Sequence, residues 1–416
     1  MSEPRRLARD LTEPEPIPAA GIARAVELMQ SGRLFRYGEM GADQLDVSLL
    51  EQEFAAFVGR KFCVAVNSGG CAIFLALKIA GVEPGDAVLV NGFTLAPVPG
   101  AILHAGAQPV IVEVTGDYVI DPTDLRAKIR SSGAKTLLLS HMRGHIADMD
   151  QVSRICAGEG VTLVEDCAHA LSAFWGERMI GSFGFAAAYS AQTYKHLNAG
   201  EGGFLVLDEP EAAARAILHS GSYMLHSQHL STPGAEALRR VSNETPNFSM
   251  RMTALAAAML RPQLAELPRR VARWNAIHRR IATGLARSQW IALPRPDAKA
   301  RFSATSIQFS IPALPPQGIE MVLATAKRRG LPIKWFGAAE QAGFTSAPRH
   351  WIYAGEQGEL ARTHAVLASL MDIRTPVTLT DDECDLIAEI VREAIDEAIA
   401  ASSQQPGSSP DLKPSA

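Results

Sequence analysis

Short apolar runs alternate along the first half of the chain with longer segments in which apolar residues recur every three or four positions. In one such segment Leu50, Phe54 and Phe57 fall on one helical face, and Gly59 follows as a stop. The apolar runs that we expect to be strands lie at residues 62–68, 86–92, 135–141, 161–167 and 186–192. Strands joined by helix-length connections are typical of an α/β fold with a mostly parallel central sheet flanked by helices.

The second half of the chain begins with a long helical pattern at residues 252–285, which we expect to break or kink near Pro268. The shorter patterns that follow predict a smaller α+β domain, and the Ser/Pro-rich end predicts disorder. The expected parts are an N-terminal arm, a large domain, a small C-terminal domain and a disordered tail, at residues 1–30, 31–270, 271–400 and 401–416.

Composition narrows the functional classes. The chain has 416 residues, of which 47% are hydrophobic, enough for a large core. A net charge of -4 gives no electrostatic reason to expect a nucleic acid partner. The sequence offers no apolar run of membrane-spanning length and no signal-peptide pattern. Five scattered cysteines without a CxxC pair indicate reduced thiols, so we expect a cytoplasmic protein that binds neither nucleic acid nor membrane.

Lys195 stands where an apolar strand gives way to a glycine-rich turn. A random lysine is usually a surface charge, but this one should lie at the sheet edge where α/β folds bind ligands. Asp166 ends another apolar strand and should reach the same edge, although alone it would equally suit a loop cap. Ser68, Gly69 and Gly70 lead from a strand into a helix, whose first backbone N–H groups suit a phosphate.

Taken together, these parts fit one cofactor, pyridoxal 5′-phosphate. A lysine amine binds this cofactor covalently, a carboxylate keeps its pyridine nitrogen protonated, and a backbone turn anchors its phosphate. The charge-assisted bond to the pyridine nitrogen is stronger than a neutral hydrogen bond and keeps the ring an electron sink. Lys195 and Asp166 are therefore candidates for chemistry rather than surface charges.

Several motifs of the chain resemble those of the DegT/DnrJ/EryC1/StrS family of sugar aminotransferases, fold type I enzymes that depend on pyridoxal 5′-phosphate. The motifs include NSGGCA (67–72), HMRGHIADMD (141–150), VEDCAHALSA (164–173), AQTYKHLNAGEGG (191–203) and NFSMRM (247–252). The resemblance covers roughly residues 30–400 and implies a large, mostly parallel sheet with a smaller C-terminal α+β domain. It also implies a homodimer with active sites at the subunit interface.

The resemblance assigns roles residue by residue. It makes Lys195 the catalytic lysine and Asp166 the partner of the pyridine nitrogen. The residues that it implies for cofactor binding are Lys195, Asp166, His169, Ser190, Gly69, Gly70, Cys71, Leu95 and Asn247. Those that we expect to face the substrates are Arg143, His145, Phe35, Tyr37 and Arg251. The segment 247–251 is expected to reach the site of the neighbouring subunit.

Some positions depart from the residues that are usual in the family. Leu95 stands where an aromatic residue often stacks on the cofactor, His169 where Gln is common, and Gln192 where His is common. Arg143 stands where Tyr is common. We expect its guanidinium to contact an anionic group of the acceptor or of a glutamate donor; the alternative is a pair with a protein acid such as Asp148 or a contact with the dimer partner.

Two further groups have more than one interpretation. His141, His145 and Asp148 have a spacing that is compatible with a metal site, but they follow a strand rather than share a helix face, and we expect no metal. The aromatic pair Trp335 and Phe336 is either core or a wall of the substrate site.

The sequence therefore predicts an aminotransferase (transaminase) that depends on pyridoxal 5′-phosphate. It would move an amino group from glutamate or glutamine to a keto group of a sugar, nucleotide sugar or related polyol or cyclitol in a biosynthetic pathway. One alternative is a non-catalytic or regulatory protein that binds the cofactor, against which the presence of both Lys195 and Asp166 counts. Another is an aminotransferase for a non-sugar ketone or aldehyde.

Overall fold

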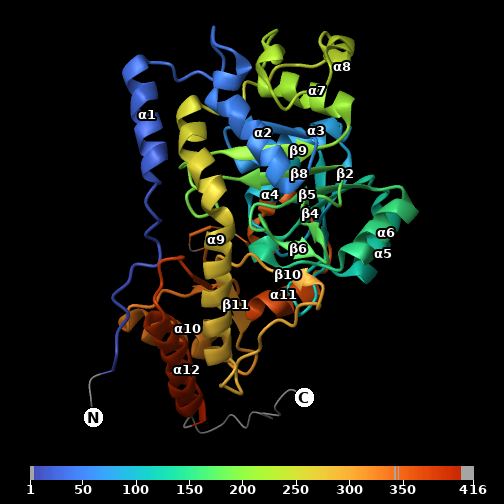
Figure 1. Cartoon of the computed structure of the whole chain (residues 1–416). Helices are drawn as coiled ribbons and strands as arrows, with labels where there is room; N and C mark the ends of the chain where they lie inside the picture. The colour runs from blue at the N-terminus through green and yellow to red at the C-terminus, as the bar shows by residue number, and fades with distance from the viewer. Residues whose placement is uncertain (1–3, 342, 345, 404–416) are drawn as a thin grey trace.

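A computed structural model describes residues 4–341, 343–344 and 346–403 (Figure 1). Its centre is a seven-stranded sheet in the order β1-β9-β8-β5-β4-β2-β3. The strands are β1 (Phe62–Val66), β2 (Ala87–Asn91), β3 (Gln108–Val112), β4 (Thr136–Ser140), β5 (Thr162–Asp166), β8 (Ala186–Ser190) and β9 (Gly203–Leu207). The strands β3, β2, β4, β5 and β8 pair in parallel, whereas β9 is antiparallel to both of its neighbours. The predicted α/β fold with a mostly parallel sheet is confirmed.

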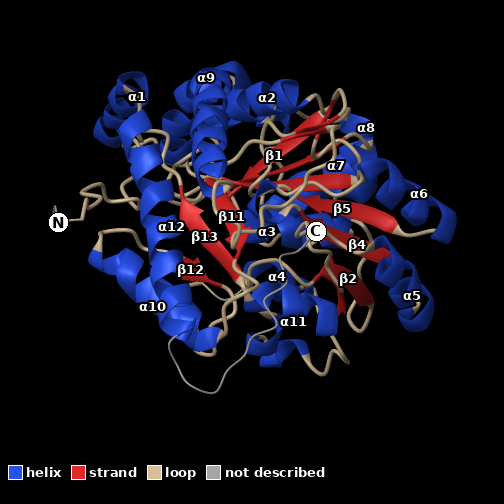
Figure 2. Ribbon diagram, turned by 90° about the horizontal axis from the view of Figure 1, so that it is seen from below, coloured by secondary structure: helices blue, strands red, loops and turns tan. Residues whose placement is uncertain are grey.

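Helices cover both faces of this sheet (Figure 2). The helices of the large domain are α2 (Asp46–Val58), α3 (Gly69–Ile79), α4 (Pro97–His104), α5 (Pro122–Ser132), α6 (Met149–Glu159), α7 (Pro210–Ser220) and α8 (Ala235–Val241). Alternate strand side chains point to opposite faces, so each face has its own apolar core. One core packs against α2, α5 and α6, and the other against α3, α4, α7 and α8.

Single residues fix several helix ends near the carboxyl edge of the sheet and elsewhere. Gly59 adopts a left-handed conformation with φ of 72° and ends α2, as expected. Asp121 accepts backbone hydrogen bonds at the start of α5, where Pro122 occupies the first turn. Ser68 caps α3 by accepting the N–H of Cys71. The turns from strand to helix are therefore defined locally by the sequence.

Helix α9 (Ala254–Leu285) joins the two domains. It continues through Pro262 and Pro268, so of the expected break or kink near Pro268 the break is wrong. Proline removes one backbone hydrogen bond, but contacts with α1 (Ala19–Ser31), α2 and α12 (Asp381–Ser403) hold the helix together. The domain boundary that we expected at residue 270 falls inside this helix.

The small domain contains a second sheet in the order β11-β13-β12. Its elements are β11 (Ser306–Ser310), α10 (Pro316–Arg328), β12 (Lys334–Trp335), α11 (Ala361–Ala368), β13 (Leu370–Arg374) and α12. A further small sheet joins β10 (Ala300–Arg301), β6 (Phe174–Trp175) and β7 (Arg178–Met179). The single-turn helices are η1 (Ala42–Gln44), η2 (Met142–Gly144), η3 (His226–Gln228), η4 (Pro348–His350) and η5 (Ile352–Ala354).

The N-terminal arm crosses the small domain before α1 begins (Figure 1). Leu7 and Leu11 are buried in the small-domain core, and the Leu7 N–H donates to the Arg329 carbonyl at 2.8 Å. At the other end of the chain, residues 401–403 of the expected tail belong to α12, and the rest of that tail lies outside the described residues.

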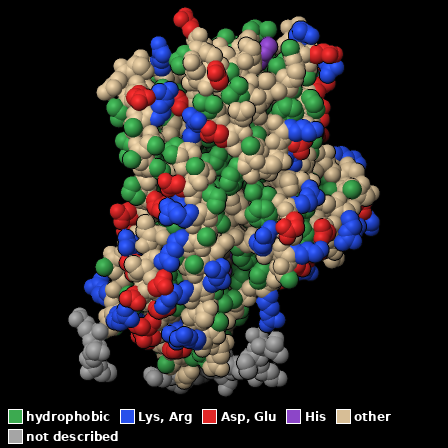
Figure 3. All heavy atoms as spheres, in the orientation of Figure 1, with side chains coloured by type: hydrophobic (Ala, Val, Ile, Leu, Met, Phe, Trp, Pro, Cys, Tyr) green, Lys and Arg blue, Asp and Glu red, His purple; other side chains and the backbone are tan. Residues whose placement is uncertain are grey.

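The surface shows charges of both signs. Over the small domain, blue and red side chains are interspersed in Figure 3, and ion pairs there join Arg273 and Arg280 of α9 to Asp381 and Asp385 of α12. A membrane span needs a long and strongly apolar helix, and none of the described helices meets that requirement.

Candidate functional site

The carboxyl edge of the large sheet opens into a cavity of about 420 Å³. The residues of our prediction that line it are Lys195, Asp166, His169, Ser190, Gly69, Gly70, Leu95 and Arg143. They come from the ends of β5 and β8, the start of α3 and the loops after β2 and β4. The structure thus brings together residues from separate segments at the edge where α/β sheets bind ligands.

Lys195 lies in the turn after β8, and its Nζ is 2.5 Å from Nε2 of His169. Burial, together with the positive charges of Arg143 and Arg374, lowers the pKa of the Lys195 amine to about 7, although Asp166 opposes this shift. A large fraction of this amine is therefore unprotonated at neutral pH. That is the form that acts as a nucleophile and as a base.

Asp166 ends β5 and is buried. Its Oδ2 accepts a hydrogen bond from Oγ of Ser140 at 2.7 Å, and its Oδ1 accepts the N–H of Ala168 at 3.1 Å. The Ser140 hydroxyl in turn accepts from Oγ1 of Thr94 at 2.8 Å. This chain of bonds fixes the orientation of a carboxylate at the wall of the cavity.

The start of α3 forms another wall. A Cβ on Gly69 would lie 2.7 Å from the Cβ of Ser190, so only glycine lets the turn approach the end of β8 this closely. The first backbone N–H groups of α3 carry partial positive charge. Cys71 does not line the cavity, and its N–H is bonded to Oγ of Ser68 at 3.1 Å.

Arg143 lines the cavity, but its charge has a partner. The residue has a positive φ of 56°, followed by Gly144 at 82°. This uncommon backbone conformation sets the direction in which the side chain leaves the loop. Its Nη2 donates to Oδ2 of Asp372 at 2.7 Å, and both side chains are nearly inaccessible to solvent. The acid is therefore Asp372 of β13 and not Asp148, which instead caps α6.

His145, which we expected to face a substrate, does not line this cavity. Its Nε2 contacts Oε1 of Gln308 at 2.9 Å, and its ring packs edge-on against Tyr118. Burial lowers the pKa of His145 to about 4. The ring is therefore neutral at physiological pH and enclosed by other side chains.

The aromatic residues near the cavity fall into two groups. Leu95 lines the cavity, whereas Phe93 is fully buried and packs edge-on against Phe336 at 5.1 Å. Phe336 is therefore core. Trp335 is partly buried, and its Nε1 donates to the carbonyl of Ala368. Neither member of this pair lines the cavity around Lys195.

Four predicted residues lie away from this cavity within the described chain: Phe35, Tyr37, Asn247 and Arg251. Tyr37 is buried, and its hydroxyl is bonded to Nε2 of His229 at 2.9 Å. Phe35 is 52% exposed, and the Arg251 guanidinium lies 5.6 Å from the centre of its ring. Phe35, Tyr37 and Arg251 thus lie near one another, apart from the Lys195 cavity of the same chain.

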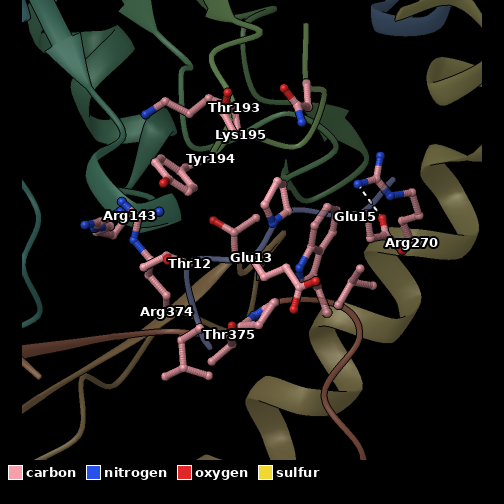
Figure 4. Close-up of a pocket in the computed structure, with 17 residues that line it drawn as sticks. Thr12, Glu13, Glu15, Arg143, Thr193, Tyr194, Lys195, Arg270, Arg374 and Thr375 are labelled. Atoms are coloured by element: carbon pink, nitrogen blue, oxygen red, sulfur yellow. Dashed lines mark ion pairs between the residues drawn. The ribbon is translucent and has the colours of Figure 1, made fainter. Parts of the chain in front are cut away.

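Sequence reasoning missed Arg374, which ends β13 and lines the cavity. Its guanidinium stacks over the ring of Tyr194 at 3.6 Å, and Figure 4 shows this ring between Lys195 and Arg374. The available signal was an arginine at the end of the short, mostly apolar segment 370–373, which Asp372 interrupts. Nothing local ties that segment to Lys195.

A second buried group of side chains contains possible metal ligands. Among the described residues, His141, Glu165 and Cys167 lie close enough together to share a metal ion. The Glu165 carboxylate, however, accepts the backbone N–H groups of Gly181, Phe183 and Gly184, and it also contacts His141. Its oxygens are therefore engaged in holding the segment between β7 and β8. The predicted pair of His145 and Asp148 takes no part in this group.

Comparisons with known proteins agree with this geometry. The sequence model of the DegT/DnrJ/EryC1/StrS aminotransferase family matches residues 19–392. Over 266 residues the chain is 35% identical to the spore coat polysaccharide biosynthesis protein SpsC of Bacillus subtilis (strain 168), an alignment that covers 61% of this chain. It spans 64% of SpsC, less than two thirds of that relative's length.

Two further relatives have names that describe a reaction. The chain is 34% identical over 277 residues to the dTDP-3-amino-3,4,6-trideoxy-alpha-D-glucose transaminase of Streptomyces venezuelae, with 66% of this chain and 67% of that protein covered. Among solved structures, 3-amino-5-hydroxybenzoic acid synthase superposes with a TM-score of 0.78 at 27% identity. That match covers 93% of this chain and 99% of the other, so the two proteins share one fold throughout.

Proposed function

This chain belongs to the DegT/DnrJ/EryC1/StrS aminotransferase family, and we propose that it moves an amino group from glutamate or glutamine to a keto group of a sugar, nucleotide sugar or related cyclitol. The observation that carries the proposal is the convergence of Lys195, Asp166 and the start of α3 on one cavity. The names of two relatives describe a nucleotide-sugar transaminase and an aminobenzoate synthase, which supports a ring ketone from a biosynthetic pathway as acceptor.

Members of this family depend on pyridoxal 5′-phosphate, and the residues of the cavity fit that group. Asp166, oriented by Ser140, would bind the protonated pyridine nitrogen. The start of α3 and the Ser190 hydroxyl would bind the phosphate, in the space that Gly69 leaves open. Lys195 would hold the cofactor covalently. When bound, the cofactor supplies an electrophilic carbonyl carbon and a ring that accepts negative charge.

Lys195 also carries the proton transfers of the proposed reaction. With a pKa of about 7, its free amine takes a proton from the α-carbon of the amino donor. In the second half of the cycle, the same Nζ delivers a proton to the acceptor carbon that receives the amino group. His169 contacts this Nζ, and burial keeps the pKa of the His169 ring well below its usual value. The neutral ring is suited to orient the amine.

We propose a homodimer in which each subunit completes the site of its partner. The support is a surface that combines the group of Phe35 and Arg251 with exposed apolar side chains. Arg251 lies between the rings of Phe35 and Tyr223, at 5.6 and 5.4 Å from their centres. The outer side of α1 exposes Ile22, Val26 and Met29. Such a surface suits burial against a second copy.

We also propose that the protein resides in the cytoplasm. All five cysteines are free, and four of them are buried. Free thiols in this number suit a reducing compartment. The location can be tested by rapid alkylation in intact cells, which records the redox state of the partly exposed Cys71. We expect this thiol to be reduced.

The test of the function uses purified protein with bound cofactor. It is incubated with glutamate or glutamine that carries ¹⁵N in the group to be transferred, together with keto sugars, their nucleotide-linked forms and keto-cyclitols. We expect the absorbance of the lysine-bound cofactor to fall with the donor and to return with one class of acceptor, which gains ¹⁵N. If the cofactor binds but no donor changes the absorbance, the regulatory alternative replaces this proposal.

The shared site has its own test. Lys195→Ala and Arg251→Gln are each expected to be inactive as homodimers, one for lack of the amine and the other for lack of the partner's contribution. After unfolding and refolding together, hybrid dimers contain one intact site, so about a quarter of the wild-type activity should return. Mixtures that stay inactive, or an active protein that sediments as a monomer, would contradict the dimer.

A further inference from the structure

A second, small cavity of about 70 Å³ adjoins the Lys195 cavity, and we call it the side chamber (Figure 4). The residues common to the linings of both are Arg143, Tyr194, Lys195 and Arg374. Its other walls come from residues 11–15 of the arm, from Arg270 and Trp274 of α9, and from residues 375–377 after β13. The arm residues precede the segment that the family model matches, which begins at residue 19.

The positive charges around the side chamber differ in whether they have partners. Arg270 pairs with Glu15 at 2.5 Å, and Arg143 pairs with Asp372 at 2.7 Å. The second carboxylate oxygen of Asp372 is occupied as well, because it accepts a hydrogen bond from Nε2 of Gln308. These two guanidinium groups are therefore neutralised by protein acids.

Arg374 is different, although it lies only two positions from Asp372 on the same strand. Among the described residues no carboxylate pairs with its guanidinium, and its buried Nη1 has no hydrogen-bond partner. The Nε atoms of Arg143 and Arg270 are also unpartnered, but each of those guanidinium groups has its acid. The contacts of the Arg374 guanidinium are ring faces, with Tyr194 at 3.6 Å and Phe344 at 5.5 Å. Ring stacking orients the planar group and leaves its N–H edge available. A charge that is partly removed from water and lacks a hydrogen-bond partner is unfavourable until an anion binds it.

We propose that Arg374 binds the carboxylate or phosphate group of a substrate whose reacting carbon lies at Lys195, with the side chamber holding that anionic end. The inference rests on the proposed function and names the chemical class of its substrate. The arm shapes the polar remainder of the chamber, where the Glu13 carboxylate and the Thr12 hydroxyl are suited to accept hydrogen bonds from substrate hydroxyl groups. The anionic group belongs either to the amino donor or to the acceptor.

The two sources are distinguished by measuring each half-reaction alone. Arg374→Gln and Arg374→Lys are compared with wild type and with Arg287→Gln, which removes an exposed arginine just after α9. Stopped-flow single turnovers of the holoenzyme use glutamate for the first half-reaction. For the second they use a phosphorylated keto sugar and its neutral counterpart.

At a pH well above the Lys195 midpoint, we expect Arg374→Gln to raise the substrate concentration for half-maximal rate by about tenfold or more, with the limiting rate constant nearly unchanged. An effect with glutamate identifies the donor carboxylate. An effect confined to the phosphorylated ketone identifies the acceptor. Arg374→Lys keeps the charge, so its half-maximal concentration should lie between those of wild type and Arg374→Gln. Arg287→Gln should match wild type.

Calorimetric titration with glutarate and with inorganic pyrophosphate gives a readout that does not depend on turnover. Wild type should bind one of these probes, and Arg374→Gln should bind it about tenfold more weakly. The inference is overturned if wild type binds neither probe, or if Arg374→Gln binds as wild type does and both half-reactions are unchanged. A wild-type protein that transfers no amino group would instead refute the proposed function, while the titration would still decide the role of Arg374.

Discussion

The cavity around Lys195 has two faces that are built differently. On the face from the large sheet, Ser140 donates to Asp166 at 2.7 Å and is itself held by further bonds, so the carboxylate is fixed. On the face from the small domain, Arg374 is held by stacking on Tyr194, and its Nη1 has no hydrogen-bond partner among the described residues. We call the first the bonded face, because its carboxylate already has hydrogen-bond partners. The opposite face presents a positive charge that has no acid partner.

The difference separates two tasks. A group that must act in the same way on every substrate benefits from a rigid network that holds it in one orientation. A group that recognises a substrate gains most if its partner is the substrate itself, because the bond then forms only in the complex. In our proposal the bonded face binds the cofactor, and the face with the available charge selects what reacts with it.

The largest effect is expected on the bonded face from Lys195→Ala. Loss of the amine should lower the rate of the donor half-reaction by about 10³-fold or more, because it removes both the covalent anchor and the proton carrier. Borohydride reduction followed by peptide mapping should label Lys195 in the wild type. Lys61→Ala is the control, and a label on another lysine would remove Lys195 from the site.

Asp166→Asn should have the next largest effect. It removes the charge that keeps the pyridine nitrogen protonated and leaves the shape nearly unchanged, so turnover should fall by about 10²-fold or more. Ser140→Ala removes only the hydrogen bond that orients the carboxylate, so turnover should fall by about tenfold. Thermal unfolding should show little change for either variant. Near wild-type turnover of Asp166→Asn would show that this face does not act through its charge.

Asp372→Asn would alter the other face by releasing Arg143 from its partner. A buried guanidinium without its acid is costly, so the free energy of unfolding should drop by about 3 kcal/mol in urea denaturation. The matched control is Glu177→Gln at the solvent-exposed pair with Arg301, which should change nothing measurable. Equal stability of both variants would mean that Arg143 is not committed to Asp372.

The smallest effect expected is on the titration of Lys195, which both faces influence. In the cofactor-free protein its amine should react with an acylating reagent with a midpoint near pH 7, because only the unprotonated form reacts. Reactivity should rise as pH increases through that midpoint. Arg374→Gln removes a positive charge that disfavours protonation, so the midpoint should move to higher pH. Arg287→Gln should leave it in place.

Part of the bonded face was predictable because Lys195, Asp166 and Gly69 are marked locally, whereas Ser140 and Thr94, which hold Asp166, were not predicted. Lys195 and Asp166 follow apolar strands, Gly69 begins a helix after a strand, and parallel strands bring such ends to one edge. Patterns along the chain also predicted the mostly parallel sheet. They did not predict that α9 passes Pro268 unbroken, because packing against three other helices decides this.

The opposite face depends on contacts between segments that lie far apart in the sequence. The nearest acid in sequence suggested Asp148 as the partner of Arg143, but that side chain caps α6, and the partner comes from β13. His145 follows a strand as site residues do, yet Gln308 and Tyr118 enclose it. Such partners follow from the packing of the two domains, which no local pattern encodes.

Helix α9 makes the two faces mechanically dependent on each other. Its 32 residues form one continuous helix of roughly 48 Å along its path, and both domains are attached along it. A rotation that separates the small-domain face from the large sheet must therefore bend this helix elastically rather than turn about a slack linker. The stiffness of a single helix thus sets how far the two faces separate when a substrate enters or a product leaves.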